Sequence, residues 1–156
     1  EVLKLMALYA PTAKDLRFLA GVFKIVNDLE RVGDLAVNLA ERALDRRSNQ
    51  TRPGIRELDE MSDHVRNMLR RSLDAFLAQN IQAAREVLAM DDRADEYLRQ
   101  VYEGQVGSMQ KGATEFEAAM RILASAKYME RIADHATNVG EDVIYMATGE
   151  LVKHRF

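Results

Sequence analysis

The chain has 156 residues, of which 47% are hydrophobic and 30% charged, and its formal net charge is −3 at pH 7. This length suffices for one domain or two small helical modules, and the near balance of charges argues against a nucleic-acid-binding protein, which needs a basic face. Cysteine is absent, which excludes disulfides and thiolate metal sites, and no apolar run approaches the roughly 20 residues of a membrane span.

Helices are predicted from the first residue onward, because two prolines and eight glycines are too few for a β architecture. Residues 1–10 read as the last turns of a helix. A long helix follows over 12–45, with Thr12 and Asp15 as a capping box. Its three-and-four spacing of apolar residues predicts a face packed in a bundle. That face comprises Leu19, Val22, Val26, Leu29, Ala36, Ala40 and Ala43.

A polar linker is predicted over 46–54, and a second helix over 55–78. Asn80 is suited to cap a third helix, predicted to run without interruption over 81–111. A second capping box, Thr114 with Glu117, predicts a last helix that ends near Thr148 and is closed by Gly149.

An internal repeat links the first long helix and the last. Residues 30–41 read ERVGDLAVNLAE and residues 130–141 read ERIADHATNVGE, with six of twelve positions identical. Most of the repeated residues are acids or amides rather than core residues, so the repeat predicts the same site twice as well as the same fold twice. The identities are Glu30, Arg31, Asp34, Ala36, Asn38 and Glu41 with Glu130, Arg131, Asp134, Ala136, Asn138 and Glu141.

The repeat also predicts how the chain is organised. The segment 55–111 should have a counterpart before residue 12, where only ten residues stand. We therefore expect an all-α protein of two repeated three-helix bundles with long antiparallel helices, the first one N-terminally incomplete. The predicted units are a partial first repeat over 1–48 and a complete second repeat over 52–150.

The repeated acids lie on one face of each helix. Glu30, Asp34, Asn38 and Glu41 fall within an arc of about 80°, and like charges four residues apart destabilise a helix unless something compensates them. Arg31 beside the first acid is one source of compensation, and a bound cation is the other. One such motif alone usually marks a solvated face, whereas two copies in register favour a cation site.

A further acidic pair, Asp91 and Asp95, also has four-residue spacing and could face Glu130 and Asp134 across a groove. Taken alone, this pair is equally compatible with a solvated face. There is no Glu-x-x-His motif of the di-iron oxidases, and carboxylate oxygens suit Mg, Mn, Ca or ferric iron. The predicted ligands are Asp91, Asp95, Glu130 and Asp134, with weaker binding at Glu30 and Asp34 and with Asn38 and Asn138 as possible outer contributors.

Two segments carry a resemblance to a known family. PTAKDLRFLAGVFKIVNDLERVGDLAVNLAERAL and YMERIADHATNVGEDVIYMATGE closely resemble the PhoU family of phosphate-transport regulators, and the resemblance covers essentially the whole chain. It implies two three-helix bundles, each with an E-x-x-x-D motif on its third helix. The family's metal-binding positions correspond here to Glu30, Asp34, Glu130 and Asp134, with Asp91 and Asp95 matching the acids of the second helix.

The resemblance further implies a cytoplasmic, commonly dimeric regulator that binds iron or another hard cation such as Mn or Mg. Such a protein restrains phosphate uptake through a phosphate ABC transporter ATPase and a phosphate-sensing histidine kinase. It reaches the membrane only through these partners and does not bind nucleic acid. The residues themselves show no catalytic nucleophile, so we expect no enzyme activity. The alternative is a carboxylate-bridged metal enzyme or a metal-storage helical bundle.

Overall fold

The computed structural model describes residues 1–44, 56–110 and 112–152, and every element within these ranges is an α-helix. This confirms the predicted all-α fold. The predicted linker over 46–54 lies outside the described residues. None of the described helices is both long enough and apolar enough to cross a membrane. The helices are α1 (Val2–Tyr9), α2 (Ala13–Leu44), α3 (Arg56–Ala78), α4 (Ile81–Leu88), α5 (Asp91–Met109) and α6 (Ala113–Thr148).

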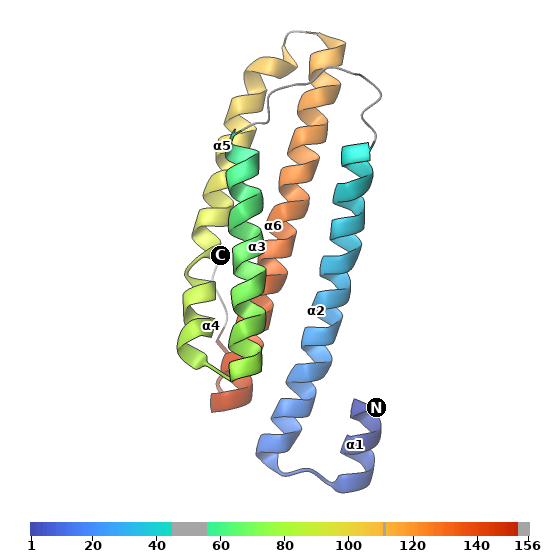
Figure 1. Ribbon diagram of the computed structural model, residues 1–156, viewed down its shortest axis with the longest axis vertical. Coiled ribbons are helices and arrows are strands. Elements are labelled where there is room, and N and C mark those ends of the chain that lie inside the picture. Colours follow the sequence, from blue (N-terminus) through green and yellow to red (C-terminus); the bar gives the residue numbers. More distant parts are fainter. Residues whose placement is uncertain (45–55, 111, 153–156) are drawn as a thin grey trace.

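The longest helix, α6, is the centre of the molecule. It packs against α2, α3, α4 and α5, and all the long helices lie along the long axis of the molecule (Figure 1). The helices α3 and α6 form a three-helix bundle with the α4–α5 pair. The helix α2 lies along α6 outside this bundle, and α1 packs against α2.

Small side chains allow these helices to approach α6 closely. Ala126, Ala133 and Ala136 are fully buried on α6, and alanine adds little bulk to a helix face. Met61 and Met68 of α3 are also fully buried, as expected for flexible side chains that fill irregular gaps between helices. The buried apolar residues form two clusters along α6, one that includes residues 126–136 and one that includes residues 139–146.

The face of α2 that packs on α6 differs from the predicted one. Ile25 and Leu35 are buried there, whereas Val26 and Ala36 of the predicted face are exposed. The prediction was wrong at Val26 and Ala36, because α2 carries apolar residues on more than one side and periodicity alone does not show which side has a neighbour. Leu29, Val32 and Leu39 complete the packed face. The exposed side also carries Phe23 and Val37.

The helix predicted over 81–111 is interrupted. Its first part ends at Leu88, and α5 begins at Asp91. Two acids, Asp91 and Asp92, stand in the first turn of α5, where negative charge interacts favourably with the helix dipole. The backbone carbonyl of Met90, at the break, lies 2.9 Å from Nε2 of His64. The break therefore places Asp91 at a helix start instead of midway along a helix.

The predicted helix ends are confirmed in part. The Asn80 side chain accepts a hydrogen bond of 3.1 Å from the backbone N–H of the third residue of α4, as predicted. The hydroxyl of Thr12 donates to the Asp15 carboxylate at 2.6 Å. The capping box at Thr114 was wrong, because α6 begins at Ala113 and its cap residue is Gly112, two residues before Thr114.

Two glycines in the repeat helices differ in their surroundings. A Cβ atom added to Gly140 of α6 would lie 2.7 Å from Cδ1 of Leu88 and 3.3 Å from the backbone oxygen of Ala84. Both atoms belong to α4, so the absence of a side chain at Gly140 permits the close packing of α4 on α6. A Cβ atom added to Gly33 of α2 would meet no atom within 4 Å.

These surroundings predict opposite effects of the same substitution. We expect Gly33→Ala to raise the free energy of unfolding by about 0.5–1 kcal/mol, because alanine costs less backbone entropy in a helix. We expect Gly140→Ala to lower it by about 1–3 kcal/mol, because the methyl group overpacks the α4–α6 contact. Chemical denaturation of both variants measures the difference. Equal stabilisation by both would contradict the close approach at Gly140.

Candidate functional site

The second copy of the repeat lies inside the three-helix bundle, where α6 faces the start of α5. Glu130 and Asp134 stand on successive turns of α6, and Asp91 and Asp95 on the first turns of α5. The side chain of Glu130 is only 13% exposed, Asp91 is buried and Asp134 is half-buried. We call Asp91, Asp95, Glu130 and Asp134 the carboxylate cluster.

The members of the carboxylate cluster act on one another electrostatically. Burial, followed by the charges of Glu130, Asp91 and Asp95, raises the pKa of Asp134 from 3.8 to about 6. The charge of Lys127 opposes this shift. Nearby like charges disfavour the ionised carboxylate, so the other three acids lie close enough to Asp134 to affect its titration.

Two members of the cluster have defined protein contacts. One oxygen of Glu130, Oε1, lies 2.5 Å from the ammonium group of Lys127, whereas its other oxygen, Oε2, is buried without a hydrogen-bond partner. The hydroxyl of Thr137 donates to Asp91 at 3.2 Å and so connects the start of α5 to α6. The orphaned oxygen of Glu130 is the atom of the cluster that most clearly lacks compensation.

The cluster has the chemistry of a hard-cation site, since it combines four carboxylates with a buried oxygen that has no donor. Its geometry is not that of a finished cage. As placed, no three Asp, Glu or His side chains of the described residues are arranged to hold one metal ion. Coordination therefore needs side-chain rotation, and metal binding stays a prediction.

The first copy of the repeat has different surroundings. Glu30 and Asn38 are exposed on α2, and the side chain of Asp34 is 63% exposed with its oxygen 3.6 Å from the Arg31 guanidinium. Exposed pairs of this kind contribute little to stability. Within the described residues, no second helix supplies acids opposite Glu30 and Asp34 in the way that α5 supplies them to the second copy.

Asn138, predicted as an outer contributor to the cluster, lies instead in a polar group between α2 and α6. Its side-chain amide donates to Oδ1 of Asp28 at 3.2 Å, and Nδ1 of His135 lies 2.8 Å from the same oxygen. Sequence reasoning missed Asp28. Asp28 could have been recognised because it lies three positions after Ile25, which places a charged residue on the packed face of α2.

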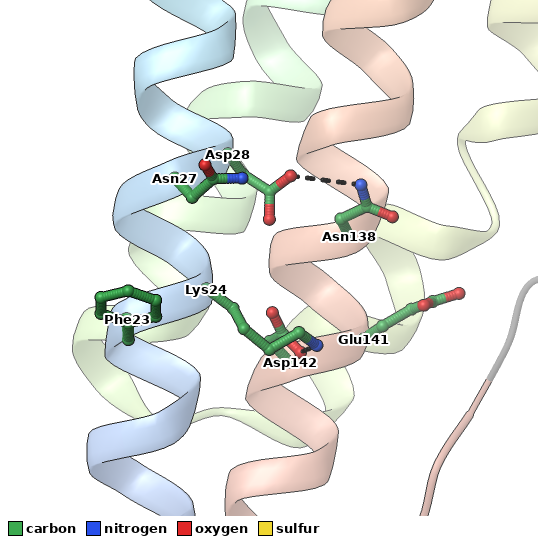
Figure 2. Close-up of a pocket in the computed structure, with 7 residues that line it drawn as sticks. All are labelled: Phe23, Lys24, Asn27, Asp28, Asn138, Glu141 and Asp142. Carbon is green, nitrogen blue, oxygen red and sulfur yellow. Dashed lines mark hydrogen bonds and ion pairs between the residues drawn. The ribbon is translucent and has the colours of Figure 1, made fainter.

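This polar group forms one side of a pocket of about 350 Å³, which we call the α2–α6 pocket (Figure 2). Below Asp28 in Figure 2, Lys24 of α2 forms an ion pair with Oδ1 of Asp142 on α6. Burial raises the pKa of Asp142, while Lys24 lowers it and Asp28 and Glu141 raise it again. The lining residues are Phe23, Lys24, Asn27 and Asp28 from α2, and Asn138, Glu141 and Asp142 from α6.

Comparison with known proteins gives a consistent result. A family model described as PhoU domain matches residues 1–43 and 58–143. A protein of Thermotoga maritima, named as a homolog of the phosphate-specific transport system accessory protein PhoU, is 31% identical over 151 residues. The alignment covers 96% of this chain but 65% of that relative, so the chain spans slightly less than two thirds of the relative's length.

Two crystal structures share the fold. The phosphate transport system regulatory protein PhoU of Streptococcus pneumoniae superposes with a TM-score of 0.87 at 29% identity, covering 97% of this chain and 71% of that chain. The PhoU of Pseudomonas aeruginosa gives a TM-score of 0.90 at 30% identity, covering 96% and 72% respectively.

The raised pKa of Asp134 predicts a pH dependence of stability in the metal-free protein. The folded form holds a proton up to pH about 6, whereas the unfolded carboxyl loses it near 3.8. The stabilisation that this proton provides is therefore complete below the unfolded pKa and is lost as the pH rises through about 6. Asp134→Asn should flatten this part of the profile and raise stability near pH 7.

Denaturation between pH 3 and pH 8 measures this effect, and Asp34→Asn is the matched control on the exposed copy of the repeat. The control should keep the wild-type profile. If Asp134→Asn and Asp34→Asn give the same profile, the proximity of the four acids does not govern the titration of Asp134.

Proposed function

The chain belongs to the PhoU domain family, and from this membership we propose that it regulates phosphate uptake as an accessory to a phosphate transport system. The observation that carries the proposal is the agreement of sequence and structure with PhoU proteins over more than nine tenths of the chain. Those proteins are named for phosphate transport, and both the sequence and the structure of this chain are similar to theirs.

The proposed mode of action is a non-enzymatic, metal-dependent contact with other proteins in the cytoplasm. The partners we propose are the ATPase of a phosphate ABC transporter and a phosphate-sensing histidine kinase, with the regulator itself acting as a homodimer. Long antiparallel helices (Figure 1) offer extended surfaces for such contacts, and the exposed apolar side of α2 is an example.

We further propose that the carboxylate cluster holds iron, Mn or Mg. A bound cation would supply positive charge to the cluster. In this chain, Asp91 is already tied to α6 by Thr137, and Glu130 is held by Lys127 through one oxygen. Removing the repulsion among the four acids would then stabilise the packing of α5 on α6. Glu30 and Asp34 should bind more weakly, because they are exposed and lack facing acids.

The metal proposal predicts a thermal shift. We expect Mn or ferric iron to raise the melting temperature of the wild-type chain, because a ligand that binds only the folded state stabilises it by about 2.7 kcal/mol at one hundred times its dissociation constant. The double variant Glu130→Gln with Asp134→Asn should lose both the shift and the bound metal. The matched control, Glu30→Gln with Asp34→Asn, should retain most of each.

Thermal scanning with and without metal, followed by elemental analysis, measures both quantities. Equal shifts for the two double variants would mean that the carboxylate cluster is not the metal site. If only the control variant lost the thermal shift and the bound metal, the metal site would be at the first copy of the repeat.

The regulatory role predicts a phenotype. Deleting the gene should cause constitutive expression of phosphate-starvation genes and unregulated phosphate uptake in phosphate-replete medium, and the wild-type gene should restore both. If metal is required, the Glu130→Gln and Asp134→Asn double variant should restore them less well than its matched control. Unchanged expression, together with oxygen-dependent iron turnover by the purified protein, would favour the carboxylate-bridged metal enzyme instead.

A further inference from the structure

The α2–α6 pocket is separate from the carboxylate cluster. The cluster lies where α6 meets α5, whereas the pocket lies where α6 meets α2, on a different side of the same helix. Asp134 and His135 are neighbours in sequence, yet the first titrates with the acids of α5 and the second contacts Asp28 of α2. The pocket therefore needs its own explanation.

Two residues with carboxylates in the pocket are largely buried. Asp28 is 8% exposed and Asp142 is 2% exposed, and a buried carboxylate is costly unless its charge is compensated. The compensation is incomplete. Oδ1 of Asp142 pairs with Lys24, whereas Oδ2 is buried without a hydrogen-bond partner.

The carboxylates of Asp28 and Asp142 point toward one another. Figure 2 shows one oxygen of Asp142 beside the Lys24 nitrogen and the other directed along the groove toward Asp28. The contacts of Asp28 with His135 and Asn138 both end on Oδ1, and Figure 2 shows its other oxygen directed into the pocket. The pocket thus presents acceptor oxygens from both helices to the space between them.

The charges of the pocket exclude an anion as its ligand. Three carboxylates, Asp28, Glu141 and Asp142, line it together with a single lysine that is already paired. As in the carboxylate cluster, no three Asp, Glu or His side chains of the described residues are placed here to hold a bare metal ion without side-chain rotation. Donors spread over an organic cation match acceptors on two helices better than a single ion does.

Two further features favour an organic cation. The Phe23 ring stands at the edge of the pocket (Figure 2), and an aromatic face attracts an ammonium or guanidinium group. The ammonium of Lys24 already occupies the position beside Asp142, while its side chain is largely exposed and can leave without disturbing the core. The pocket volume of about 350 Å³ lies within the range of small-molecule sites.

We propose that the α2–α6 pocket binds a small organic cation with an ammonium or guanidinium group between Asp28 and Asp142, displacing the Lys24 side chain. Such a group reaches the pocket either as a free diamine or as the basic side chain of a partner protein. Because the ligand spans α2 and α6, its binding strengthens the contact between these two helices.

Isothermal titration of the full chain with agmatine and with acetyl-arginine amide tests this proposal. Agmatine carries both groups in a free molecule, and acetyl-arginine amide presents the guanidinium as a protein would. We expect saturable binding of one molecule per chain. Binding of agmatine alone identifies a free diamine, and binding of both probes identifies a guanidinium from either source. No saturation by either probe at concentrations on the order of 10 mM would overturn the proposal.

Variants assign the binding to the pocket. Asp142→Asn or Asp28→Asn should weaken binding about tenfold or more, as the loss of a charge-assisted contact implies, and Lys24→Met should strengthen it by removing the internal competitor. Glu41→Gln is the matched control, because Glu41 is the exposed counterpart of Glu141 in the first repeat and its loss changes the net charge equally.

Phe23→Leu should also weaken binding. Because Phe23 is exposed, this variant should fold, so it still tests the proposal if a variant of a buried acid does not fold. Equal weakening by Glu41→Gln would mean that the probes bind through net charge alone. Stronger binding of inorganic phosphate than of either cation would also overturn the proposal.

Discussion

The burial of α6 is the constraint on which the rest of the structure depends. Four helices pack against it, and fully buried alanines along its length allow that approach. An acid on such a helix is removed from water on at least one side. Its ionised form is then costly unless a cation or a hydrogen-bond donor lies next to it. The partly uncompensated oxygens of Glu130 and Asp142 are consequences of this single packing arrangement.

The same constraint explains why two copies of one motif differ in chemistry. Asp34 and Asp134 occupy equivalent positions of the repeat, but α2 is covered by α6 on one side only, whereas α6 is enclosed. Asp34 is therefore solvated and pairs with Arg31, while burial and the acids of α5 act on Asp134. Sequence identity in a repeat preserves the residue types of a site, and the packing around each copy decides their protonation and their affinity for cations.

The helices, the repeat and the acids at 91, 95, 130 and 134 could be predicted from the sequence because they depend on local periodicity and spacing. The packed face of α2 could not, since two apolar sides compete and only a tertiary neighbour chooses between them. At the break before Asp91, the Met90 carbonyl contacts His64, 26 residues earlier in the chain, and local periodicity does not indicate such a contact. The pairing of Asp28 with His135 joins residues 107 positions apart, for which local patterns carry no signal.

The chemistry of the two polar groups bears on how phosphate status could reach these helices. Both the carboxylate cluster and the α2–α6 pocket are rich in acids, and both therefore favour cations over anions. Phosphate, with its negative charge, is repelled at either group at neutral pH. In the proposed regulatory role, information about phosphate then arrives through a protein partner rather than through phosphate bound at these sites, and cations at α6 set the rigidity of the surface that the partner meets.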